Sequence, residues 1–108
     1  MAVENVIMEL SQHTEEMIAN RNELCQSIRE IIVERLMLDI SVDFISNDQP
    51  LVGRGLELDS IDILDIGVAV DMQWGVKVTD DIMSEVFSSV NHIADFIEQE
   101  RAKAEDYE

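Results

Sequence analysis

The sequence is poor in the residues that cross-link small domains or break helices, with one cysteine, one proline and four glycines among 108 residues. Because Cys25 has no cysteine partner and no Cys/His cluster indicates a metal site, we expect a reducing compartment, the cytoplasm. No Lys or Arg precedes Arg21, so the N-terminus lacks the basic segment of a signal peptide. Asp65 and Asp71 interrupt the most apolar stretch, and no run approaches the roughly 18–20 apolar residues that span a bilayer.

Basic residues are also scarce, because 7 Lys and Arg stand against 24 Asp and Glu, which gives a net charge of -17. This balance argues against binding to nucleic acid, whose phosphates require Lys and Arg, and against anionic membrane surfaces. It favours partner proteins with basic patches, since opposite fields accelerate encounter. The hydrophobic fraction of 46% is too high for a disordered acidic chain, so we expect one domain with its own core.

Helical periodicity dominates the first third of the chain. It predicts a helix from about residue 21 to residue 38, for which Asn20 with Glu23 resembles a capping box, and Thr14 is a second possible start. The residues that share the apolar face of this helix are Leu24, Ile28, Ile31, Ile32 and Leu36.

Apolar residues at similar spacing upstream indicate one or two more amphipathic turns: Val3, Val6, Ile7 and Leu10. We therefore expect a helical N-terminal extension over residues 1–20, a domain over residues 21–101 and a frayed acidic tail over residues 102–108. Within the domain, residues 39–58 combine turn-forming and apolar residues, which predicts a long loop anchored on the core.

The next helix is predicted from Ser60 to about Trp74, with Asp59 as its N-cap and Gly75 at its end. The residues expected to face inward are Leu64, Ile66, Gly67, Val70 and Trp74, and those expected to project outward are Asp62, Asp65 and Asp71. Trp74 has a second interpretation, as the lining of a cavity for an apolar chain.

Two further helices complete an all-α prediction. A short one is expected over about residues 80–86, and the last over about residues 89–101, capped by Ser88 or Ser89. The core stripe expected for the last helix is Val90, Ile93, Ala94 and Ile97.

The segment Asp59-Ser60-Ile61-Asp62-Ile63-Leu64-Asp65, followed by Trp74-Gly75-Val76, resembles the acyl carrier protein family over roughly residues 22–101. In that family the serine of an Asp-Ser-Leu/Ile motif carries a 4′-phosphopantetheine arm taken from coenzyme A. The resemblance implies an all-α, four-helix bundle with a long loop between the first two main helices. It also implies that Ser60 is the attachment residue, at a helix start where backbone N–H groups favour a phosphate oxygen.

The resemblance assigns roles to the neighbours of Ser60 as well. It implies that Asp59 helps to hold Mg²⁺ in the complex with the phosphopantetheinyl transferase, and that Ile61 and Val68 are apolar contacts near the arm and for partner enzymes. The carboxylates expected to meet Arg and Lys on those enzymes are Glu57, Asp62, Asp65 and Asp71. Because exposed ion pairs are typically worth less than about 1 kcal/mol, we expect transient, salt-sensitive docking.

Plainer interpretations of the same residues remain open. Asp59 and Ser60 are also ordinary helix caps, and an acidic helix face is also an ordinary solvated face. The chain departs from the commonest family pattern, because the glycine lies upstream at Gly55 and Ile61 replaces leucine; residues 50–56 resemble stand-alone carriers of dedicated lipid or polyketide-like pathways. A serine hydrolase has little support, because no Gly-x-Ser-x-Gly elbow surrounds Ser60 and both histidines are distant in sequence.

From the resemblance we expect a monomeric carrier, not an enzyme, that holds acyl intermediates as thioesters for a fatty-acid, lipid or polyketide-like pathway. The expected partners are a phosphopantetheinyl transferase, an acyltransferase or acyl ligase, and ketosynthase-type enzymes with basic patches, with the acyl chain as cargo. The alternative is an unmodified acidic helical adaptor that keeps a carrier-like fold and binds a basic partner protein.

Overall fold

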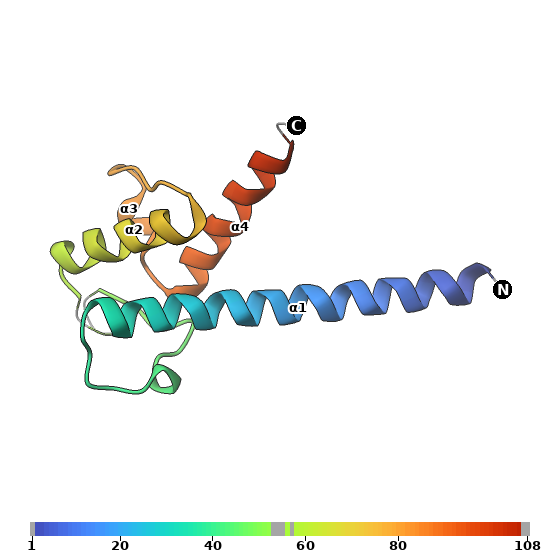
Figure 1. Cartoon of the computed structure of the whole chain (residues 1–108), viewed down its shortest axis with the longest axis horizontal. Helices are drawn as coiled ribbons and strands as arrows, with labels where there is room; N and C mark the ends of the chain where they lie inside the picture. Colours follow the sequence, from blue (N-terminus) through green and yellow to red (C-terminus); the bar gives the residue numbers. More distant parts are fainter. Residues whose placement is uncertain (1, 53–55, 57, 107–108) are drawn as a thin grey trace.

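A computed structural model describes residues 2–52, 56 and 58–106, with side chains described from residue 16 to residue 103 of these ranges. The expected all-α fold is confirmed, since the described residues form four α-helices and one short 3-10 helix, and no strand beyond an isolated bridge (Figure 1). In chain order the elements are α1 (Ala2–Arg35), η1 (Val42–Phe44), α2 (Ser60–Trp74), α3 (Met83–Val86) and α4 (Val90–Asp106).

The first helix begins much earlier than either predicted start. α1 is continuous over 34 residues, about 51 Å at 1.5 Å per residue, which accounts for most of the 56 Å long axis of the molecule. The capping interpretation of Asn20 is wrong, because no proline or glycine occurs before Pro50 and the helix continues through position 20. Figure 1 shows the N-terminal half of α1 projecting beyond the other helices.

α1 also ends earlier than the predicted residue 38. The backbone N–H of Met37 donates to the Glu34 carbonyl at 3.3 Å, and that of Leu38 donates to the Val33 carbonyl at 3.0 Å. Met37 has a left-handed backbone (φ 53°). These bonds form a Schellman motif, which ends the helix at Arg35, and a residue other than glycine adopts the left-handed conformation.

The core lies where the C-terminal half of α1 packs against α2 and α4. The predicted stripe of α4 is confirmed, because its four residues are fully buried. The side chains with 0% exposure come from α1, α2, α4 and the segment before α2: Ile28, Ile32, Leu51, Ile66, Val70, Val90, Ile93, Ala94 and Ile97.

The predicted ends of α2 are confirmed, but one of its inward residues is not. Ile66 and Val70 are buried as expected, whereas Leu64 is 54% exposed and Ile63 occupies the inward position instead. The reason is helical register: residues 63, 66 and 70 share one side of the helix, and position 64 is turned about 100° from position 63. Gly67 lies against Phe87, where an added Cβ would be 3.5 Å from the ring, an ordinary contact distance, so the expectation that a glycine is needed here for close approach is not confirmed.

The last two helices differ from prediction in length. α3 begins only at Met83, because the preceding residues form a turn in which the Thr79 hydroxyl donates to Asp81. α4 continues to Asp106, five residues beyond the predicted end, through a sequence without proline or glycine. Ser89 is its cap, since its Oγ accepts the His92 backbone N–H at 3.2 Å. Within the part of the chain that the structure describes, no helix combines the length and apolar character needed to cross a membrane.

Candidate functional site

Asp59 and Ser60 form the start of α2. Asp59 has an extended backbone (φ -98°), and its carboxylate accepts a hydrogen bond from the Asp62 backbone N–H at 2.9 Å. The Asp62 carboxylate in turn accepts the Asp59 N–H at 3.2 Å, which completes a reciprocal capping box. Asp59 is therefore the cap that the sequence predicts, and it fixes the backbone at Ser60, which is exposed.

One backbone hydrogen bond joins the segment before α2 to the bundle, and a second joins two parts of the segment to each other. The N–H of Leu51 donates to the Ser88 carbonyl at 3.1 Å, and the N–H of Leu58 donates to the Leu51 carbonyl at 3.0 Å. Both leucines are buried. Because these bonds join the chain just before Ser60 to the junction of α3 and α4, the exposed hydroxyl residue is carried by a fixed part of the fold.

A groove of about 450 Å³ opens beside Ser60. Its walls are mainly apolar, and Ser60 contributes to its lining. A hydroxyl at such a place is able to carry a flexible tether whose apolar load lies along the groove. The apolar lining residues are Pro50, Val52, Ile63, Met83 and Phe87.

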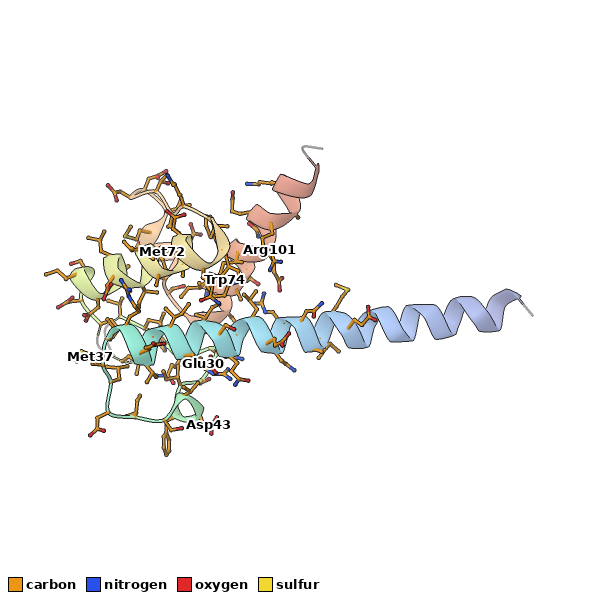
Figure 2. All side chains as sticks on the ribbon, in the orientation of Figure 1. Glu30, Met37, Asp43, Met72, Trp74 and Arg101 are labelled. Atoms are coloured by element: carbon orange, nitrogen blue, oxygen red, sulfur yellow. The ribbon has the colours of Figure 1, made fainter. Side chains whose placement is uncertain are left out.

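Trp74 does not line the groove beside Ser60. It is half-buried and lines a separate groove between α1 and α4, together with Arg101 (Figure 2). Its packing against the core agrees with the first of the two interpretations of this residue.

An exposed apolar row runs along α2 on the side that faces away from the core. Ile61 is 76% exposed and Val68 is 50% exposed, which leaves both accessible to a partner. Leu64 and Met72 belong to the same row, at 54% and 78% exposure, and neither was predicted from the sequence to be an exposed contact. The signal was available, because residues 61, 64, 68 and 72 recur at the three- and four-residue spacing of one helix face.

The carboxylates of α2 have more specific partners than the sequence indicates. Asp62 is engaged in the capping box, and Asp65 accepts from the Arg35 guanidinium at 2.5 Å. Asp71 is half-buried at the other edge of the exposed row, and Glu57 lies outside the described residues. The pairing of Arg35 with Asp65 joins residues 30 positions apart, so no local pattern in the sequence could have predicted it.

Two other side chains of reactive type, Cys25 and Ser89, have structural roles. Cys25 is 2% exposed, and burial raises the pKa of its thiol, with Arg21 and Arg29 opposing the shift, so it is a core residue. Ser89 Oγ lies 2.7 Å from His92 Nδ1, but this serine is 4% exposed and caps α4, which argues against a role as nucleophile. Across the described residues, no three His, Cys, Asp or Glu side chains converge to hold a metal ion.

Comparisons with known proteins agree with this geometry. The family model for the phosphopantetheine attachment site matches residues 26–97. The chain is 33% identical over 82 residues to an acyl carrier protein of Thermotoga maritima, a match that covers 76% of this chain and 96% of that protein.

Two solved structures share the fold. One is the solution structure of a holo acyl carrier protein from Nitrosomonas europaea, with a TM-score of 0.62 and 24% identity, covering 72% of this chain and 95% of that one. The other is a chain in the crystal structure of an engineered Bradyrhizobium japonicum glycine:carrier protein ligase complexed with a carrier protein from Agrobacterium tumefaciens and ATP. Its TM-score is 0.59 and its identity 22%, covering 70% of this chain and 97% of that one.

The family match includes Ser60. It spans most of the part of α1 that is packed in the core, all of α2 and α3, and the buried part of α4. The identity to the Thermotoga maritima protein extends over almost the whole of that relative. The chain therefore belongs to the acyl carrier protein family, whose members are carriers and not enzymes and bear a covalently attached phosphopantetheine.

Proposed function

We propose that Ser60 is the attachment residue of the phosphopantetheine arm, and that the chain carries acyl groups as thioesters on it. The main support is the position of Ser60, exposed at the capped first turn of α2 and lining an apolar groove of about 450 Å³. The backbone N–H groups of a helix N-terminus favour phosphate oxygens, so the residues present fit a phosphodiester at this serine.

Asp59 has a different role in this proposal. Its carboxylate lies next to the attachment residue and disfavours a second anion there, unless a cation lies between them. We assign it to holding Mg²⁺ in the complex with the transferase that loads Ser60. When bound, the arm supplies a thiol that holds the cargo as a thioester. Ile63, Met83 and Phe87 supply the apolar wall along which the cargo is sheltered from water.

Partner enzymes dock, in this proposal, on the exposed side of α2. The apolar contacts are Ile61 and Val68, extended by Leu64 and Met72. Acidic contacts at the edges come from Asp62, Asp65 and Asp71, and the sequence adds Glu57, which lies outside the described residues. The partners are a phosphopantetheinyl transferase, an acyl ligase or acyltransferase and ketosynthase-type enzymes, in a cytoplasmic fatty-acid, lipid or polyketide-like pathway.

Intact mass spectrometry tests the attachment site. The chain is incubated with coenzyme A, Mg²⁺ and a broad-specificity phosphopantetheinyl transferase, alongside Ser60→Ala and the matched control Ser84→Ala. Ser84 is exposed and lines the same groove, so its replacement removes a neighbouring hydroxyl without removing the proposed site. We expect the wild type and Ser84→Ala to gain one phosphopantetheine, and Ser60→Ala to gain none while it remains helical by circular dichroism.

Two outcomes would contradict the proposal. Modification of Ser60→Ala would show that the arm is attached to another residue. A folded wild-type chain that carries no phosphopantetheine, either as purified or after incubation, would favour the unmodified adaptor instead.

A further inference from the structure

α1 extends well beyond the part of the chain that matches known carriers. The family match begins at residue 26, whereas α1 begins at Ala2. Arg21 still joins α1 to α4, because its guanidinium lies 2.8 Å from Asp95 and 3.1 Å from Glu98. N-terminal to Arg21 the two helices diverge, and Figure 1 shows no other described element beside the projecting half of α1.

Two apolar side chains lie just N-terminal to this ion pair. Met17 is 58% exposed and Ile18 is 57% exposed. With Arg21 and Glu98 they line an open hollow of about 550 Å³. Single exposed apolar residues are normal on a protein surface, but an exposed pair that lines a hollow beside a second helix is a candidate contact surface.

Met17 continues the core-facing side of α1. It precedes Leu24 by seven residues, which is close to two helical turns, so the two share one side of the helix, and Leu24 is buried. The sequence repeats the pattern toward the N-terminus, because positions 3 and 10 fall at the same seven-residue interval. Both positions are apolar, Val3 and Leu10. In the sequence, this seven-residue interval therefore continues the apolar pattern of the buried stripe toward the N-terminus.

An amphipathic helix in water owes most of its stability to packing of its apolar side. The hollow at Met17 adjoins a second one of about 540 Å³ between α1 and α4, and the two share Glu98. The second hollow is lined by Leu24 as well, and by Trp74 and Arg101, which Figure 2 labels. A helix laid along α1 would thus contact the exposed apolar pair Met17 and Ile18 in the first hollow and Trp74 in the second, which is otherwise mainly polar.

Charge decides which occupant fits. Residues 2–20 contain four glutamates and no Lys or Arg. Within the hollows Arg21 is paired with Glu98, and Arg101 stands against Glu23 and Glu98, so the excess negative charge comes from α1 and from the chain as a whole. A second copy of this chain would bring another net charge of -17 and the same glutamates, which repel. A helix with Lys and Arg beside its apolar stripe would complement both features. We propose that the projecting half of α1 and the adjoining hollows against α4 are a docking surface for a basic amphipathic helix of a partner protein.

The test uses the full chain and a synthetic helical peptide with leucines along one face and lysines on its flanks. A second peptide carries glutamates in place of the lysines. Because the chain contains one tryptophan, Trp74, its fluorescence reports on the hollow that it lines, and isothermal titration calorimetry gives the Kd. We expect the basic peptide to bind and to change the Trp74 emission, and the acidic peptide not to bind.

Substitutions separate this surface from non-specific attraction to an acidic protein. The double variant Met17→Gln/Ile18→Gln keeps good helix formers at exposed positions, so α1 is expected to remain intact. We expect its Kd for the basic peptide to rise at least roughly tenfold, because two apolar contacts are lost. The control is Met37→Gln, which replaces an exposed methionine just beyond the other end of α1, and its Kd should equal that of the wild type.

Equal Kd values for the wild type and Met17→Gln/Ile18→Gln would overturn the proposal, as would binding of the acidic peptide. A doubled mass in light scattering that Met17→Gln/Ile18→Gln returns to that of one chain would assign the surface to a second copy instead. The proposal does not depend on loading of Ser60: the Ser60→Ala variant is expected to bind the basic peptide like the wild type, so failure of either proposal is recognised separately.

Discussion

α2 carries apolar side chains on two opposite sides, and only one side is covered. Ile63, Ile66 and Val70 face α1 and Phe87 and are 6%, 0% and 0% exposed. On the other side, Ile61 and Met72 are 76% and 78% exposed. The two sides are alike in residue type, so hydrophobicity alone does not separate residues that stabilise the fold from residues that are available to partners. Burial against distant parts of the chain makes that distinction.

The largest expected effect separates the two sides by stability. Ile66→Ala leaves a cavity in the core and should lower the free energy of unfolding by about 2–5 kcal/mol, whereas the exposed Leu64→Ala should change it by no more than about 0.5 kcal/mol. Urea denaturation followed by circular dichroism measures both values. Similar losses for the two variants would mean that the exposed row contributes to the core.

Loading of the phosphopantetheine arm should depend on the exposed side of α2, the side that contributes little to stability. Leu64→Ala combined with Met72→Ala removes part of the proposed docking row, and we expect kcat/KM of a phosphopantetheinyl transferase for the carrier to fall about tenfold, or 1.4 kcal/mol. The urea midpoint should stay at the wild-type value. Met37→Ala removes an exposed methionine outside α2 and serves as the control. Unchanged loading of the double variant would remove these two residues from the docking surface.

Gly67 lies on the covered side and tests how tightly that side is packed. An added Cβ would meet Phe87 at 3.5 Å, an ordinary contact distance, so Gly67→Ala should raise the free energy of unfolding by roughly 0.5–1 kcal/mol through helix propensity. Gly67→Leu should instead lower it by about 1–3 kcal/mol, because the larger side chain overpacks the contact with the ring. Thermal unfolding of both variants distinguishes a close contact from an open space.

The smallest effect concerns the ion pair at the edge of the exposed row. Arg35 and Asp65 are 40% and 38% exposed, so their coupling in a double-mutant cycle with Arg35→Gln and Asp65→Asn should be below about 1 kcal/mol. It should diminish further near 1 M salt, where the screening length is about 3 Å. A larger coupling that persists in high salt would mean that the pair is shielded from solvent and is a structural element of the bundle.

Much of the site was predictable because its determinants are local. Asp59 and Asp62 form the capping box within four residues, and Gly75 ends α2 with φ 68°. The assignment of Ser60 as the attachment residue comes from the same segment and stays a prediction until loading is measured. The predicted division at residues 20 and 21 also stays a prediction, although α1 passes this point without a break.

The sequence by itself determined the all-α character, the limits of α2 and the core stripe of α4, because caps and helical periodicity act between residues only a few positions apart. Only the tertiary structure decided which apolar side of α2 is covered and that Arg35 pairs with Asp65. These features depend on packing and contacts between segments far apart in the chain. A pattern read along one helix states which residues share a side, and the neighbouring helices determine which side is buried.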